Sequence, residues 1–574
     1  MAIENLITDH LDLWTAAVRP KSSAGRGSNS KRELTGIKKL RELILELAVR
    51  GKLVPQDPSD EPASVLLERI ATEKTRLVKE KKIKKSKALP EIGEEEKLFE
   101  LPDGWEWCRL SDIAFPQAGF AFKSNGFNEH GEGIPLIRIR DVGQVFSGTY
   151  YNGEYKPEFV VMSGEYLISM DGNFRVAPWS GSEALLNQRV TRLMFFFEKT
   201  AKRFIAESLQ LRLISLQGVK AYTTVDHLSG GQIAESVIAI PPLAEQHRIV
   251  AKVDDLMALC DQLELRSESQ LAAHQTLVET LLATLTDSCD ADELAQNWAR
   301  LSTHFDTLFT TERSIDSLKQ NILQLAVMGK LVQQDPSDEP AAALLERIAA
   351  EKAQLVKEKK IKKEKPLPAI SEDEKPFELP KGWEWCRLPD LGELARGKSK
   401  HRPRNDPKLY VNGTIPLVQT GDVARADCLI ESYTAMYNEI GLAQSQLWPK
   451  GTLCITIAAN IADTGILGFD ACFPDSVVGY TPYEPSLPVV YFDFFIRTAK
   501  ENLERFAPST AQKNINLEIL SNILVPCPPT QEFIRIVSRV NDLFAICDQL
   551  KSRLQTSQQT QLALAESLVE GALA

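Results

Sequence analysis

Residues 47–85 read LAVRGKLVPQDPSDEPASVLLERIATEKTRLVKEKKIKK, and residues 325–363 read LAVMGKLVQQDPSDEPAAALLERIAAEKAQLVKEKKIKK. Only seven of the 39 paired positions differ, so the chain contains an internal duplication. The two copies start 278 residues apart, which is much longer than the repeat of a solenoid protein. The repeated unit is therefore about half of the 574 residues, and the two halves should share one architecture.

Each copy of this stretch leads into a region that begins with a GWEW motif. FELPDGWEWCRLSDIA occupies residues 99–114, and FELPKGWEWCRLPDLG occupies residues 377–392. Short apolar runs separated by Gly and Pro follow both motifs, which is typical of strands in a compact domain. Each region closes at a proline pair, within IAIPPLAEQ or LVPCPPTQE. We therefore predict two mixed α/β (α+β) domains, a first globule at 99–243 and a second globule at 377–529.

A long helix is predicted after each proline pair. Ile249, Val253, Leu256, Cys260 and Leu263 alternate four and three apart, as in a coiled-coil seam, and the seam should resume at Leu277 and Leu281. The second helix has the same pattern from Ile536 to Leu554, and should resume at Leu564 and Leu568. His274 falls in a polar interruption and is interpreted as an inter-helix polar residue, not a metal ligand. A helix of about 40 residues is about 60 Å long, so these helices are spacers.

The order of the segments indicates a circularly permuted duplication. The predicted organisation is an N-terminal helical region at 1–98, the first globule, a central helical spacer at 244–376, the second globule and a C-terminal helix at 530–574. The two chain ends together supply what the central spacer supplies alone. This arrangement predicts pseudo-two-fold symmetry, with two globules separated by long antiparallel coiled-coil helices.

Composition excludes several classes of protein. A net charge of −11 argues against a general nucleic-acid coat, although local basic patches can still bind DNA. Nine cysteines without a CxxC pair fit a reducing cytoplasm, and those at repeat-equivalent places should be small buried core residues. The acidic N-terminus does not fit a signal peptide, and no apolar run approaches the length of a membrane helix.

In combination, these features resemble the specificity subunit of type I restriction-modification enzymes. The resemblance covers essentially the whole chain. It rests on the LP-x-GWEW motifs at Leu101–Trp107 and Leu379–Trp385, the strands IPLIRIRDV and IPLVQTGDV, the proline-pair helix starts and the duplicated stretch. One departure is CPPTQE at Cys527–Glu532, where the family form is PPLAEQ.

The resemblance implies two target-recognition domains, each reading half of a split DNA sequence. It also implies two methyltransferase subunits docked on the helices and two ATP-driven restriction subunits. S-adenosylmethionine, ATP and Mg would then be bound by the partners, and this chain would be a non-catalytic subunit. Two alternatives are a specificity protein of a phage-defence methyltransferase without the usual nuclease, and a coiled-coil scaffold whose globules bind proteins.

Several polar residues of the globules are candidates for DNA contact. In the second globule, a loop with no acid carries five cations, which predicts a phosphate clamp, with a solvated loop as the alternative: Arg396, Lys398, Lys400, Arg402 and Arg404. Arg138 and Arg140 of the first globule occupy the place of Gln419 in the second. Arg and Gln side chains pair with guanine and adenine edges, although one strand face pointing to solvent would give the same pattern.

Two further pairs of loops are candidates. Residues 171–175 and 458–462 share an asparagine, Asn173 or Asn460, and differ around it; Arg175 belongs to the first of these loops. Residues 223–227 and 509–514 are polar and precede the closing strand, and the second of them contains Gln512 and Lys513. The lysines of residues 79–87 either form a solvated helix end or contact the DNA backbone.

One motif in the second globule matches a nucleotide-binding pattern by chance. Residues 392–399, GELARGKS, satisfy the P-loop pattern, but KHRPRNDP follows with two prolines and no helical periodicity. A working P-loop opens a helix at the phosphates, so nucleotide binding here is not expected. The chain also has no NPPY or DPPY tetrad and no HExxH pair. The sequence therefore favours DNA recognition without catalysis.

Overall fold

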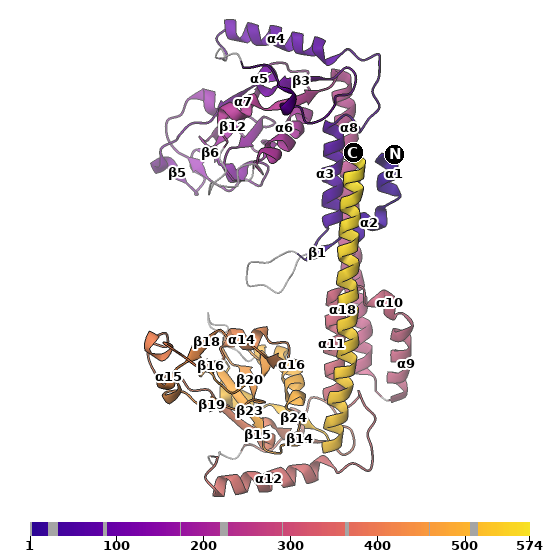
Figure 1. Cartoon of the computed structure of the whole chain (residues 1–574), viewed down its shortest axis with the longest axis vertical. Coiled ribbons are helices and arrows are strands. Elements are labelled where there is room, and N and C mark those ends of the chain that lie inside the picture. The colour runs from indigo at the N-terminus through magenta and orange to yellow at the C-terminus, as the bar shows by residue number, and fades with distance from the viewer. Residues whose placement is uncertain are drawn as a thin grey trace. The chain divides into compact units, whose positions relative to one another are not determined.

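The computed structural model describes residues 3–20, 32–83, 89–172, 174–217, 228–289, 291–361, 367–458, 460–505 and 515–573. The chain forms two compact units (Figure 1). Unit 1 consists of residues 1–269 and 557–574, and unit 2 consists of residues 270–556. Each unit contains one mixed α/β globule together with helices, which confirms the predicted fold class.

The helical part of unit 1 is built around α3 (Thr35–Val49), whose apolar face is fully buried. It packs on the first part of α8 (Leu243–Asp287) and the last part of α18 (Thr530–Leu573). Arg41 pairs with Asp261 and Glu264 of α8, both at 2.6 Å, and Lys39 lies 3.2 Å from Glu566 of α18. The short helices α1 (Ile3–Thr8) and α2 (Leu11–Ala16) cover α3 and bury Trp14.

Unit 2 repeats this arrangement with the roles of the two long helices exchanged. Here α11 (Glu312–Val327) packs on the last part of α8 and the first part of α18. Asn321 donates a hydrogen bond to the Leu282 carbonyl of α8 at 2.8 Å, and Lys319 pairs with Asp548 of α18 at 2.6 Å. Lys319 and Asp548 are the repeat counterparts of Arg41 and Asp261, so the contact recurs as a circularly permuted duplication predicts. Two helices, α9 (Ala291–Thr303) and α10 (Phe305–Leu308), precede α11.

The predicted heptad phase is wrong at the first resumed position of each long helix, although Leu281 and Leu568, the next predicted positions, are partly buried against the cores. Leu277 and Leu564, where the seam was expected to resume, are 51% and 52% exposed. The buried positions are one residue later, at Val278 and Ala565. An α-helix has 3.6 residues per turn and not 3.5, so a seam interrupted by polar residues drifts round the helix. His274 is a polar contact as predicted, since its Nε2 lies 3.1 Å from the Thr307 carbonyl of α10.

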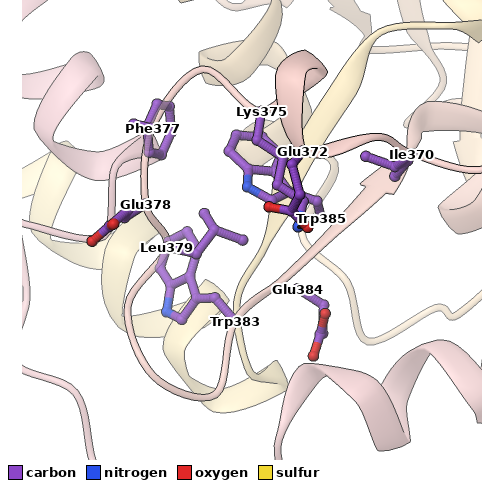
Figure 2. A pocket seen from close by; sticks show the side chains of 9 residues that line it. All are labelled: Ile370, Glu372, Lys375, Phe377, Glu378, Leu379, Trp383, Glu384 and Trp385. Carbon is purple, nitrogen blue, oxygen red and sulfur yellow. Dashed lines mark hydrogen bonds and ion pairs between the residues drawn. The ribbon is translucent and has the colours of Figure 1, made fainter.

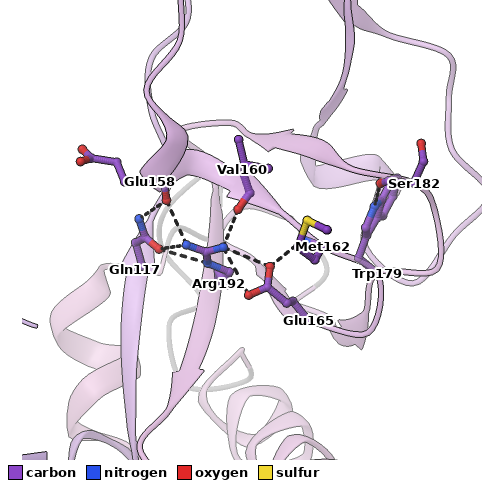
Figure 3. A network of polar contacts seen from close by, with 8 residues as sticks. All are labelled: Gln117, Glu158, Val160, Met162, Glu165, Trp179, Ser182 and Arg192. Atoms are coloured by element: carbon purple, nitrogen blue, oxygen red, sulfur yellow. Dashed lines mark hydrogen bonds and ion pairs between the residues drawn. The ribbon is translucent and has the colours of Figure 1, made fainter. Parts of the chain in front are cut away.

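Among the described residues, the first globule contains a four-stranded sheet, a five-stranded sheet, one further pair of strands and α6 (Lys202–Gln217). The four-stranded sheet has the order β10-β9-β12-β4, from Val176–Pro178, Tyr166–Ser169, Val190–Phe195 and Ala114–Ala118. The five-stranded sheet has the order β5-β7-β6-β11-β8, from Phe127–Asn128, Tyr150–Tyr151, Ile134–Ile137, Ala184–Leu186 and Val160–Val161. Buried Arg192 joins the two sheets: it donates to Gln117 of β4, Glu165, and the Val160 carbonyl of β8 (Figure 3).

The second globule repeats the four-stranded sheet of the first globule with the same strand register. Its order β15-β23-β20-β21-β17 uses Gly392–Arg396, Val477–Pro482, Leu453–Thr456, Thr464–Leu467 and Leu429–Ile430. The smaller sheet has the order β18-β16-β22-β19, from Ala435–Tyr437, Ile415–Leu417, Ala471–Cys472 and Leu447–Trp448. Helix α16 (Val489–Arg505) packs on β20 and β21. Gly479 and Ala395 face each other across β23 and β15, where the first globule has Arg192 and Gln117.

A buried tryptophan joins each globule to its long helix. The Trp105 indole N–H donates to Glu245 of α8 at 3.1 Å, and Gln56 from the duplicated stretch donates to the same carboxylate. The equivalent Trp383 donates to Glu532 of α18 at 3.0 Å, and this carboxylate also accepts from Gln334. The CPPTQE departure therefore leaves the contact unchanged. Beside each tryptophan, β3 (Glu106–Arg109) pairs with β13 (Val237–Ile240), and β14 (Glu384–Arg387) pairs with β24 (Leu524–Cys527).

The second helices of the duplicated stretch, α4 (Ala63–Lys79) and α12 (Ala341–Lys357), have the same bounds in repeat numbering. Both begin with a backbone hydrogen bond to the globule, from Ala63 to the Gly104 carbonyl or from Ala341 to the Gly382 carbonyl. The repeat-equivalent cysteines are buried, as predicted: Cys108, Cys386, Cys260 and Cys547. Among the described helices, none combines the length and apolar character that crossing a bilayer requires.

Candidate nucleic-acid interface

A capped helical turn follows equivalent strands in the two globules. After β6, Arg138 is the N-cap of the turn η3 (Ile139–Asp141), and its backbone N–H donates to the Asp141 carboxylate at 2.8 Å. After β16, Gln419 is the N-cap of α14 (Thr420–Arg425), and its backbone N–H donates to Asp422 at 2.8 Å. Arg138 and Gln419, which the sequence comparison pairs, therefore occupy the same structural position in their own globules. One backbone frame presents a different side chain in each globule.

The aspartates of these turns are structural and not contact residues. Asp141 is 1% exposed and also accepts a hydrogen bond from the Ser147 backbone at 2.8 Å. Asp422 is 4% exposed and accepts from Thr434 and Arg425. Such carboxylates satisfy backbone donors at a helix start, which fixes the direction in which the N-cap residue leaves the strand.

Arg140 is exposed but is held in place. Its guanidinium donates to Ser147 at 2.9 Å and to Thr149 at 3.1 Å. The Arg138 side chain is half-buried and, within the described ranges, makes no hydrogen bond or ion pair. Of the two predicted contact residues on this turn, Arg138 is thus the one whose donors remain available.

Hairpin loops lie next to these turns. The first joins β9 to β10 and contains Arg175, whose backbone exchanges hydrogen bonds with Ser169. The second joins β20 to β21 and contains Asn460, an exposed residue whose carbonyl accepts from Thr456. Turn η3 packs on β9, and α14 packs on β20, so each globule brings its capped turn beside the strand that leads into its hairpin. Asn173 lies outside the described residues.

The cationic loop of the second globule is organised by one acid. Arg404 donates to the Asp475 carboxylate at 2.6 Å, and Arg402 lies 3.8 Å from the same group. Arg396, at the end of β15, donates to the Asp475 backbone carbonyl at 3.0 Å. Asp475 lies more than 70 residues away in sequence, and no local pattern predicts it. Three of the five predicted clamp residues therefore converge, and the acid-free loop is partly neutralised in space.

The two lysines of this loop differ from its arginines. Lys398 and Lys400 are exposed, and neither side chain has a polar partner in the part of the chain that the structure describes. Near them, Asp406 accepts from the Lys408 backbone and from His401, and these contacts lower the pKa of Asp406. The first globule has Phe120 and Phe122 in the equivalent loop, packed edge to face at 5.2 Å. The loop is thus aromatic in one globule and cationic in the other.

The P-loop pattern does not form a phosphate cradle. Residues 392–396 are strand β15, and residues 397–406 contain no helix. Gly397 is buried against the Phe473 carbonyl, which leaves no room for a phosphate group at its Cα. The described residues also hold no group of three His, Cys, Asp or Glu side chains that could bind a metal ion.

The remaining candidates are outside the described residues. These are Gln512 and Lys513, the loops 223–227 and 509–514, and Lys84, Lys85 and Lys87; the other lysines of residues 79–87 are described, and Lys82 pairs with Glu80 at 2.8 Å. The candidates outside the described residues remain predictions from the sequence. Residues that the sequence did not indicate also lie near the candidate surface: Arg425 is 61% exposed beside Asp422, and Arg189 pairs with Asp171 of the first hairpin.

Comparison with known proteins gives one consistent family. The model of the type I restriction modification DNA specificity domain matches twice, at residues 102–273 and 380–557. The specificity subunits of the type I restriction enzymes EcoEI and EcoAI of Escherichia coli are 43% and 41% identical, each over 100% of both chains. A chain from a solved type I R-M system is 18% identical and covers 83% of this chain and 99% of its own, with a TM-score of 0.44. The chain therefore belongs to the family of type I restriction-modification specificity subunits.

Proposed function

We propose that each globule reads one half of a bipartite DNA target. The observation that supports this proposal is that the two globules share a backbone arrangement but differ in the side chains placed on it. Both globules place an N-cap residue after the same strand and a hairpin beside it, but the N-cap residue is Arg138 in one and Gln419 in the other, and the hairpin position of Arg175 carries Ala462. Two readers of different half-sites need this combination, because the spacing must stay fixed while the bases read differ.

The side chains suit base readout in the major groove. Arg138 can donate two hydrogen bonds to a guanine edge, whereas Gln419 can donate to and accept from an adenine edge. We expect Arg140 to be a less adaptable contact, because Ser147 and Thr149 already use its donors. Asn173 and Gln512 have the chemistry to read adenine as well, so we keep them as candidates.

The cationic loop supports a role in holding the phosphate backbone. The chain carries a net charge of −11, so its attraction to DNA must come from local clusters. In the proposed clamp, Lys398 and Lys400 contact phosphates directly, and Lys513 adds to them. Arg396, Arg402 and Arg404 are oriented by Asp475, which holds their guanidinium groups on one side of the loop.

The chemistry is proposed to belong to partner subunits. Two methyltransferase subunits, docked on the helices, would bind S-adenosylmethionine, and two restriction subunits would bind ATP and Mg. This chain would be a non-catalytic, cytoplasmic subunit that selects where they act. The alternatives, a coiled-coil scaffold or a specificity protein for a nuclease-free phage-defence system, are not favoured by the match to type I restriction enzyme subunits along the whole chain.

Methylome sequencing of cells that express this chain with its methyltransferase partner tests the proposal. We expect one bipartite motif with a fixed spacer. Arg138→Ala should relax the preference at one position of one half-site, and Gln419→Ala should do the same in the other half-site only. Arg69→Ala, at a surface ion pair with Glu61 on α4, is the matched control and should leave the motif unchanged. A continuous motif, or no motif, would contradict the proposal.

A further inference from the structure

A pocket of about 660 Å³ lies in unit 2, beside the start of the second globule. It is bounded by the turn η5 (Glu372–Glu374), the segment 377–379 and the first residues of β14. Its apolar wall includes Phe377 and Trp385, whose ring centroids are 5.0 Å apart. Figure 2 shows the carboxylates of Glu378 and Glu384 on two sides of these aromatic rings. The pocket is therefore aromatic and acidic.

Every residue that lines this pocket recurs 278 positions earlier in the chain. Residues 89–110 and 367–388 differ at five positions, and none of the five is among the nine lining residues. The counterparts of Phe377 and Trp385 are Phe99 and Trp107, again 5.0 Å apart. Exposed neighbours outside the lining do change, as Leu98 does to Pro376. Within these two segments, the five changes therefore all avoid the pocket lining.

The retained carboxylates do not hold the fold together. The side chains of Glu378 and Glu384 are exposed and form no ion pair or hydrogen bond with other described residues, and the same holds for the side chains of Glu100 and Glu106. By contrast, Lys375 is already paired with Glu372 at 2.6 Å, as Lys97 is with Glu94. The pocket thus carries two uncompensated negative charges. An acidic surface repels DNA, so this feature is separate from the proposed DNA interface.

The chain itself shows which group the aromatic wall accepts. In unit 1 the Arg50 guanidinium lies over the Phe99 ring, 5.7 Å from its centroid. In unit 2 the residue at the position of Arg50 is Met328, which has no charge to place over Phe377. A guanidinium is attracted both by the face of an aromatic ring and by carboxylates at its edge. An arginine side chain therefore matches the aromatic wall and the negative charge of the pocket.

We propose that this pocket and the site around Phe99, which has the same lining residues, are two docking sites, each for an arginine-bearing segment of one copy of the methyltransferase subunit. Two sites with the same lining residues on one chain fit two copies of one partner, whereas DNA would present a different sequence to each globule. The inference rests on the proposed function, because it assumes that this partner exists. It adds to the docking on the helices a contact surface at the start of each globule.

Charge reversal tests the proposal in the full chain co-expressed with its methyltransferase subunit. Glu378→Lys with Glu384→Lys should weaken binding of one methyltransferase copy at least tenfold, so that native mass spectrometry at limiting concentration shows one copy per chain and not two. Glu100→Lys with Glu106→Lys should do the same, and the four changes together should remove both copies. Asp373→Lys with Glu95→Lys is the matched control: these acids are exposed in the same turns but outside the pocket lining, and both copies should remain.

The outcomes separate this inference from the proposed function. If the fourfold variant binds both copies within threefold of the wild-type affinity, the docking sites are wrong. The same conclusion follows if DNA affinity changes while the number of bound copies does not. Hydrogen exchange in β14 and β24 that matches the wild type would show that a loss of binding is not a loss of folding. If the wild-type complex itself methylates no bipartite motif, the proposed function fails, whatever the variants do.

Discussion

The two globules solve the same packing problem at one position of their main sheets in opposite ways. In the first, Arg192 and Gln117 face each other across β12 and β4, and the guanidinium also binds Glu165 and two backbone carbonyls (Figure 3). In the second, Gly479 and Ala395 face each other across β23 and β15. Trp448 and Phe473, stacked at 5.0 Å, fill the space above the glycine. The backbone register is kept, while a polar interior is exchanged for an aromatic one.

This difference shows which structural features are the same in the two copies of the duplication. The strand register, the aspartate that caps the turn, and the tryptophan that contacts the long helix are the same in both globules. The sheet interior and the loop beyond β4 or β15 are not. The interior and loop side chains of a globule can therefore change without loss of its attachment to the helix, provided that its interior remains well packed.

The largest effect should come from removing the polar interior. Arg192→Leu removes the guanidinium that donates to Gln117, Glu165 and two carbonyls, and we expect it to destabilise the first globule by about 3 kcal/mol. Hydrogen exchange of β12 and β4 in the full-length chain measures this loss. Arg69→Leu removes only a surface ion pair and should cost under about 1 kcal/mol. Equal exchange in the two variants would show that the Arg192 network is not what joins the sheets.

The aromatic interior should be nearly as intolerant of added volume. A Cβ on Gly479 would lie 2.8 Å from ring atoms of both Trp448 and Phe473, so Gly479→Ala should cost about 1–3 kcal/mol. Hydrogen exchange of β23 and β15 measures this loss of stability. Gly571→Ala is the control: no atom lies within 4 Å of its added Cβ, and Ala favours a helix, so that variant should be stabilised slightly. An unperturbed Gly479→Ala variant would mean that the aromatic stack can move aside.

The shared caps should give equal effects in both globules. Asp141→Ala and Asp422→Ala each remove a side chain that accepts from an N-cap backbone N–H, and each should cost about 1 kcal/mol. Because the caps aim Arg138 and Gln419, each variant should also weaken recognition of one half-site. Thermal unfolding and methylation of the two half-sites measure the two effects. The surface aspartate variant Asp103→Ala should change neither, and unequal costs at the two caps would break the equivalence of the turns.

The smallest effect is a pH dependence common to both globules. Burial raises the pKa of Glu245 and of Glu532 above the ordinary glutamate value. The folded state therefore holds these protons more tightly than the unfolded state, so the contribution of each group to stability falls as pH rises above about 4.3 and through the raised pKa. Glu245→Gln and Glu532→Gln should each gain stability relative to wild type across that window. Unfolding measured at several pH values checks the slope, and a gain in one globule only would contradict the equivalence.

The sequence predicted the frame of this protein better than its surface. The duplicated stretch, the proline pairs and the GWEW motifs located both globules and both long helices, because these signals are local and repeated. The seam phase failed at Leu277 and Leu564, since a strict heptad does not follow a real helix through a polar interruption. The role of Asp475 could not be predicted, because its arginine partners are brought to it only by the pairing of β15 with β23.

The candidate contact residues illustrate the same limit. Arg138 and Gln419 were aligned correctly because a strand and a capped turn fix them. For Arg140 the sequence gave no sign that Ser147 and Thr149 would take up its donors. Which side chains touch bases remains a prediction, since readout depends on loop geometry and not on residue type alone.

The cysteines have a practical consequence. Burial raises the pKa of Cys260, Cys428 and Cys547 to about 11, so almost none of these thiols is a reactive thiolate at neutral pH. Cys289, just after α8, is instead exposed to solvent. A maleimide dye should therefore attach there first in the unmodified chain. That single label would let fluorescence follow assembly and DNA binding without any engineered substitution.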